Sequence, residues 1–125
     1  MLLVISCANK SAKQRHNEEM PKWIYEGSHN FGRICYVGSS LPHVKGLSYQ
    51  RALAVTRAIE GIAQQKNVKV DVEIEKIMSG TRNNTKTEIM TYTVQTTNGQ
   101  NVSSTITDIW LNPENDEIFI RMCED

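Results

Sequence analysis

Between residues 48 and 66, apolar side chains recur every three or four positions, a pattern that predicts an α-helix with one buried face. The members of this stripe are Ala52, Val55, Ile59 and Ile62. Ser48 stands where its side-chain oxygen can cap the first turn. Gly61 lowers helix stability by about 1 kcal/mol relative to Ala, so either the helix approaches another element closely there or the residue is a tolerated flaw.

The segments on both sides of this helix have the pattern of β-strands. Residues 34–37 are rich in β-favouring side chains and end at Gly38. Over residues 68–77 apolar and charged side chains alternate, which predicts a strand with one face on a core and the other exposed. The alternation sets Val68, Val70, Val72 and Ile74 against Lys69, Asp71, Glu73 and Glu75.

The C-terminal part of the chain predicts three more strands joined by two turns. Asn98 and Gly99 favour the two positive φ values of a tight hairpin turn. A second turn, over residues 112–116, contains a proline, which cannot donate a hydrogen bond to a strand ladder. The predicted strands are residues 87–97, 102–111 and 117–123.

Together these elements predict an α+β fold in which one main helix packs on a mainly antiparallel sheet, in the order β-α-β-β-β-β. The 125 residues suffice for one ordinary core and not for two comfortable domains. We expect a single domain over residues 21–125, with Trp23 as the anchor at the start of its core.

Charge and hydropathy argue against two classes of protein, nucleic-acid-binding proteins and proteins with a membrane-spanning helix. Fourteen Lys and Arg balance fourteen Asp and Glu, so the basic surface of a nucleic-acid-binding protein is missing. The apolar run near the N-terminus, residues 2–5, is far shorter than the roughly 20 residues of a membrane-spanning helix.

The candidate chemical residues show no spacing typical of a catalytic or metal site. The cysteines and histidines have no close paired spacing, so no zinc, other metal or cofactor is predicted. Ser39 or Ser40 with His43 and Asp108 lacks the Gly-x-Ser-x-Gly elbow of a hydrolase, and no phosphate-binding glycine loop is present. The cysteines and histidines are Cys7, Cys35, Cys123, His16, His29 and His43.

The N-terminal run Val4-Ile5-Ser6-Cys7 resembles a lipobox, the end of a bacterial lipoprotein signal. The resemblance implies that the Cys7 thiol receives a diacylglycerol, that residues 1–6 are the removed remnant of the signal, and that the new amine is acylated. A complete signal is about 15–30 residues long with a basic start, and no basic residue precedes Cys7. Either Met1 is internal to a longer reading frame or the match is accidental.

Residues 7–20 are polar and lack apolar periodicity, which predicts a flexible tether between a lipid anchor and the folded domain. An ordinary ragged terminus is the alternative. Ala8, at the position after Cys7, resembles the pattern that is sorted to the outer membrane.

Acylation of Cys7 would leave Cys35 and Cys123 as an even pair, each within a predicted strand. In an oxidising envelope they can form a disulfide, provided that their Cα atoms lie within about 7 Å. The alternative is two buried thiols that pack as small apolar side chains.

Several short motifs resemble the LPP-twenty family of bacterial outer-membrane lipoproteins, which includes the FlgP-type proteins of the flagellar basal disc. The resemblance spans most of residues 21–123. It implies that the protein acts as a surface antigen or as a building block of an envelope machine, because the family shows no consistent enzymatic site. The motifs are Pro21-Lys22-Trp23-Ile24, Tyr36-Val37-Gly38-Ser39, the run from Ala52 to Ala58 with Ala63, and the pair of segments from Ile106 to Trp110 and from Ile118 to Ile120.

We therefore expect a non-enzymatic outer-membrane lipoprotein, anchored through Cys7 on the periplasmic side, that is a structural or assembly component of a flagellar or secretion-type envelope complex. Its expected partners are envelope proteins or further copies of the chain, docked on exposed strand edges. A soluble periplasmic binding module or inhibitor is the alternative, and a small hydrolase is a third reading.

Overall fold

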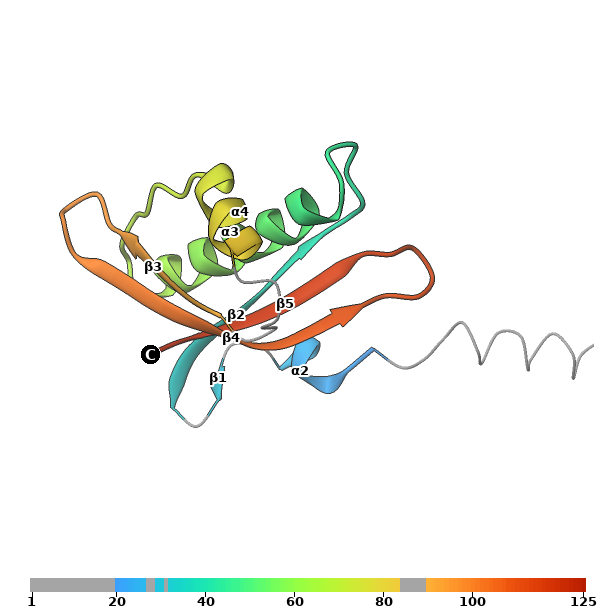
Figure 1. Cartoon of the computed structure of the whole chain (residues 1–125). Coiled ribbons are helices and arrows are strands. Elements are labelled where there is room, and N and C mark those ends of the chain that lie inside the picture. The colour runs from blue at the N-terminus through green and yellow to red at the C-terminus, as the bar shows by residue number, and fades with distance from the viewer. Residues whose placement is uncertain (1–19, 27–28, 31, 84–89) are drawn as a thin grey trace, which may run out of the picture.

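A computed structural model describes residues 20–26, 29–30, 32–83 and 90–125 (Figure 1). Three helices fall in these ranges: α2 (Lys22–Tyr25), α3 (Leu47–Gln65) and α4 (Ile74–Asn83). The strands are β1 (His29–Asn30), β2 (Arg33–Ser40), β3 (Thr91–Gln95), β4 (Asn101–Leu111) and β5 (Ile118–Glu124).

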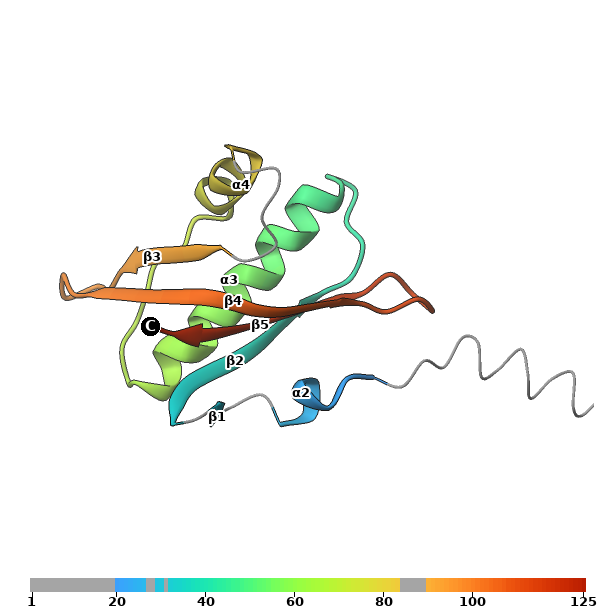
Figure 2. The same cartoon turned by 60° about the horizontal axis from the view of Figure 1, so that its bottom comes forward.

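The strands form one antiparallel sheet in the order β1-β2-β5-β4-β3. Helix α3 lies across one face of the sheet, and α4 packs beside α3 (Figure 2). The short helix α2 contacts β5 through Trp23, whose ring lies under Arg121. Arg121 alternates along β5 with the core residues Ile120 and Met122, so α2 lies on the face of the sheet opposite to α3. The predicted α+β fold, with one main helix on an antiparallel sheet, is confirmed.

The apolar stripe of α3 is buried as predicted, since all four of its members are 0% exposed. They pack against Ile106, Ile120 and Met122, which project from the same face of β4 and β5. This helix–sheet layer holds the core.

Two glycines allow α3 to approach β2 closely. A Cβ atom on Gly38 would lie 2.0 Å from the carbonyl oxygen of Ala54. A Cβ atom on Gly61 would lie 2.1 Å from the ring of Tyr36. Of the two interpretations of Gly61, the close approach is therefore correct.

The predicted cap at Ser48 is wrong, because α3 begins one residue earlier. Gly46 precedes the helix with a φ of 98°, a conformation that favours glycine, and no side chain caps the first turn. The Gly46 carbonyl accepts a hydrogen bond from the Gln50 N–H at 3.1 Å. The backbone of Gly46 thus starts the first turn before Ser48.

The strand predicted over residues 68–77 is wrong, because no strand lies in the described chain between α3 and α4. Val70 forms a single bridge with Thr96, and helix α4 then begins at Ile74. Ile74, Ile77 and Met78 have helical spacing and pack against the core. This packing outweighs the period-two pattern, and α4 continues as far as Asn83.

The hairpin between β3 and β4 also differs from its prediction in detail. The Thr96 N–H donates to the Gln100 carbonyl, which leaves a loop of three residues, and φ is positive at Gly99 but not at Asn98. The strand predicted from residue 87 begins at Thr91 within the described chain, and residues 87–89 lie outside it.

Trp23 was predicted to anchor the core, and that prediction is wrong. It lies half-buried in α2, on the face of the sheet away from α3. The core beneath α3 is instead closed by aliphatic side chains and Tyr92.

Candidate functional site

The predicted lipid-attachment residue, Cys7, lies outside the described residues, as do the rest of the predicted tether up to residue 19 and His16. Acylation at Cys7 therefore stays a prediction.

The other two cysteines are joined in the structure. Cys35 in β2 lies directly opposite Cys123 in β5, and the S–S distance is 2.03 Å. Their Cα atoms are 4.0 Å apart, which is within the limit of about 7 Å for a disulfide. The disulfide predicted as one of two alternatives is therefore present. Both side chains are fully buried, and the bond links positions 88 residues apart. Because neighbouring Tyr36 and Gly38 face α3, the disulfide lies on the opposite face of the sheet.

A cluster around Arg121 occupies that outer face beside α2. The guanidinium donates to Asp108 Oδ2 from Nε at 2.9 Å and from Nη2 at 2.6 Å, and Nε also lies 3.0 Å from Thr107 Oγ1. Its carbon lies 5.9 Å from the ring centroid of Trp23. The β4 register shifts between Ile106 and Asp108, so a bulge brings Thr107 into this cluster. The contact between Arg121 and Trp23 attaches α2 to the sheet.

A row of hydroxyl groups covers the outer face of β3 and β4. Thr91 pairs with Thr105, and Thr93 pairs with Ser103, each with an oxygen–oxygen distance of 2.7 Å. Thr105 also donates to Asp125 at 2.7 Å. These are cross-strand pairs of the kind that stabilise a sheet, and we call them the hydroxyl row.

The residues considered for a hydrolytic triad make separate contacts. Ser40 Oγ donates to the Leu41 carbonyl, and His43 Nδ1 accepts a hydrogen bond from the Lys45 N–H. Asp108 is engaged by Arg121. Among the described residues, no three His, Cys, Asp or Glu side chains gather in a group that could hold a metal ion.

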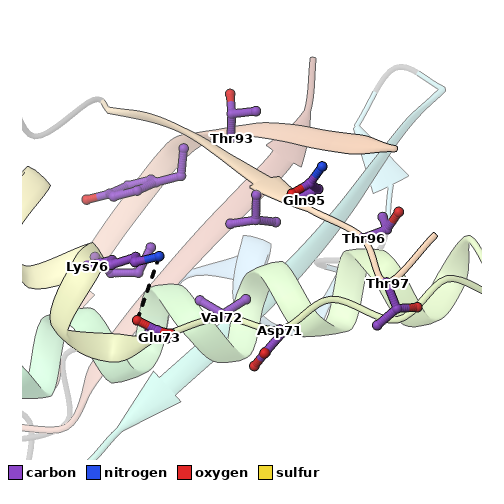
Figure 3. A pocket seen from close by; sticks show the side chains of 11 residues that line it. Asp71, Val72, Glu73, Lys76, Thr93, Gln95, Thr96 and Thr97 are labelled. Atoms are coloured by element: carbon purple, nitrogen blue, oxygen red, sulfur yellow. Dashed lines mark ion pairs between the residues drawn. The ribbon is translucent and has the colours of Figure 1, made fainter. Parts of the chain in front are cut away.

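A cavity of about 450 Å³ lies between β3 and the chain that leads into α4 (Figure 3). One wall is β3 with the start of its hairpin loop, and the other is residues 71–73 with the first turn of α4. Glu73 and Lys76 form an exposed ion pair at 3.8 Å on that second wall. We call this cavity the edge slot; its lining residues are Asp71, Val72, Glu73, Lys76, Ile77 and Tyr92 to Thr97.

The sequence reasoning missed the edge slot, because it placed a full strand where the slot opens. The available signal was the change of period at Ile74, after which Ile77 and Met78 continue with helical spacing. After the isolated Val70–Thr96 bridge the chain enters helix α4 at Ile74 and does not continue along β3.

Within the ranges that the structure describes, no helix combines the length and the apolar character needed to cross a membrane. Comparisons with models of protein families, with curated proteins and with solved structures found no match.

Proposed function

We propose that this protein is an exported, non-enzymatic lipoprotein of the bacterial outer membrane that serves as a structural or assembly component of an envelope complex. The observation that carries the proposal is the Cys35–Cys123 disulfide. Disulfides form and persist in oxidising compartments such as the periplasm and are rare in the cytosol. A domain whose central strands are joined in this way fits an exported protein.

The anchor follows from the remaining cysteine. With Cys35 and Cys123 paired, Cys7 is the one thiol left in the chain, and it ends the run that resembles a lipobox. The resemblance to the LPP-twenty family, in motifs that begin at Pro21, supports the same assignment. We propose the periplasmic side of the outer membrane as the location of the domain.

The assembly role is supported by the character of the described surfaces. In the Arg121 cluster the polar groups are hydrogen-bonded within the cluster, and in the hydroxyl row the hydroxyl groups are hydrogen-bonded within the row. The edge slot instead borders a strand with open backbone groups, a feature used for docking another chain. We propose envelope proteins or further copies of this chain as the partners.

The second candidate is a soluble periplasmic binding module or inhibitor, and the volume of the edge slot favours it. About 450 Å³ is within the size range of small-molecule sites. Such sites are mostly apolar with a few converging polar groups, whereas Asp71, Glu73 and Lys76 line this slot together with its apolar residues. This mixture favours a polypeptide over a compact apolar ligand.

Metabolic labelling with an alkyne-bearing fatty acid, followed by membrane fractionation, tests the proposal against its alternative. We expect the label on the protein in the outer-membrane fraction, and we expect a Cys7→Ser variant to lose both the label and the membrane location. Unlabelled protein in the soluble periplasm would support the binding module. Protein in the cytosol with Cys35 and Cys123 reduced would contradict both.

A further inference from the structure

The two edges of the sheet differ in how many of their outward backbone groups are hydrogen-bonded, and the edge along β2 is the protected one. The short strand β1 pairs only with Arg33 and Ile34. Further along β2, Gln65 Nε2 donates to the Cys35 carbonyl at 2.9 Å, and an Arg57 guanidinium N–H donates to the Ser39 carbonyl at 2.6 Å. Side chains of α3 thus occupy acceptors that an added strand would use, which is a common protection against edge pairing.

The β3 edge lacks this protection over part of its length. The Thr96 N–H donates to Gln100, and the Met90 carbonyl accepts from Ile106, so the even-numbered residues of β3 direct their backbone groups to β4. The odd-numbered residues consequently direct theirs to the open edge. Thr97 bonds there to the Lys69 carbonyl at 2.9 Å, next to the single bridge at Thr96.

Thr93 lies beyond that bridge, inside the edge slot. No hydrogen bond to another described residue uses its outward N–H or its carbonyl. Figure 3 shows Thr93 and Gln95 along β3, with Glu73 and Lys76 on the opposite wall. The open donor and acceptor of Thr93 therefore border a cavity of about 450 Å³.

We propose that the edge slot binds an extended segment of a partner protein by strand addition to β3, with Thr93 donating one backbone hydrogen bond to the segment and accepting another. The added strand alternates its side chains between two different surroundings. Those directed inward would meet Val72, Ile77 and Val94, and those directed outward would extend the hydroxyl row. The matching segment therefore alternates apolar and hydroxyl-bearing residues.

The two walls of the slot select a single extended segment over the edge of another folded sheet. A second copy of this chain that offered its own β3 would bring its residues 71–77 against the same opening, because these residues flank β3 in every copy. The identity of the partner as an envelope protein rests on the proposed function, but strand addition itself does not require the lipid anchor.

The test uses the full, disulfide-bonded chain and a labelled peptide of alternating Val and Thr with Lys at both ends, with binding measured by fluorescence anisotropy. Thr93→Pro removes the outward N–H and leaves the ladder to β4 intact, because that N–H does not face β4. We expect binding to weaken about tenfold or more. Thr93→Val, which keeps the N–H and the β preference, is the matched control and should bind within about threefold of the unchanged chain.

Two N-methylated versions of the peptide test the same claim without altering the protein. In an added strand only alternate amides face β3, so methylation of one alternating set should abolish binding and methylation of the other set should preserve it. Equal binding of both peptides, or unchanged binding to Thr93→Pro, would overturn the proposal. Self-association of the chain that Thr93→Pro abolishes would make a second copy the occupant and would also overturn it. None of these results depends on Cys7, so failure here and failure of lipid anchoring are distinguishable.

Discussion

Gly38 is the residue at which the helix–sheet packing tolerates least change. A Cβ atom there would meet the Ala54 carbonyl oxygen at 2.0 Å and the Ala58 backbone nitrogen at 2.6 Å. Because both atoms belong to the α3 backbone, relief would require the whole helix to move. We expect Gly38→Ala to lower the free energy of unfolding by about 3 kcal/mol or more, measured by urea denaturation. A loss under about 1 kcal/mol would show that α3 does not rest on β2 at this distance.

Gly61 provides a contrast, because the atoms that crowd it belong to the Tyr36 side chain, which is 39% exposed. Gly61→Ala alone should destabilise the domain by about 1–3 kcal/mol. In a Tyr36→Ala background the ring is gone, and the same change should instead stabilise α3 by about 1 kcal/mol through its helix propensity. A double-mutant cycle measures this reversal.

The control for that cycle is Gly38→Ala in the same Tyr36→Ala background, which should show no rescue because its obstruction is backbone. If Gly61→Ala were equally costly with and without the Tyr36 ring, the close contact between α3 and that ring would be refuted.

At the scale of the elements, the disulfide joins two strands through cysteines that lie 88 residues apart in the sequence. Closing a loop of that length restricts the unfolded chain, so we expect the Cys35→Ala, Cys123→Ala double variant to lose about 2–5 kcal/mol of unfolding free energy. Urea denaturation with and without a reductant measures the difference.

The matched control is Cys7→Ala, which retains the disulfide and should unfold like the unchanged protein in both conditions. Equal stability of the oxidised and reduced protein would contradict the assigned contribution of the Cys35–Cys123 bond.

The elements also show where sequence reasoning succeeds and where it stops. The apolar stripe of α3 and the alternation of β5 each have one period and one apolar face, so local pattern was sufficient to place them. Ile74 belongs to two patterns at once, as the last member of an alternating run and the first of a helical one. Ile77 packs against core residues that are distant from it in the sequence, and this packing favours the helix α4 over a continued strand.

At the scale of the whole molecule, the candidate surfaces differ in how far the sequence could predict them. The cysteine pairing was accessible because Cys35 and Cys123 each lie in a predicted strand and form an even pair once Cys7 is set aside. Their direct opposition depends on the sheet order, in which β5 lies between β2 and β4. The edge slot was not accessible, because it exists only where the chain leaves β3 after one bridge.

In the whole molecule the proposed lipid anchor and the proposed strand addition at β3 are compatible. A domain with an anchor at one end and an open strand edge would be suited to joining an envelope surface to another protein. The proposed anchor and the proposed docking edge are separate: the first depends on Cys7 and the second on Thr93. Each can be removed without the other.

We propose that this protein is exported, acylated and disulfide-bonded, and the mass of the intact protein, isolated from its own cells without reductant, is the decisive measurement. We expect a polypeptide that begins at Cys7, carries acyl chains and shows the loss of two hydrogens expected for the Cys35–Cys123 bond. An unacylated polypeptide that retains Met1 and contains three free thiols would contradict it.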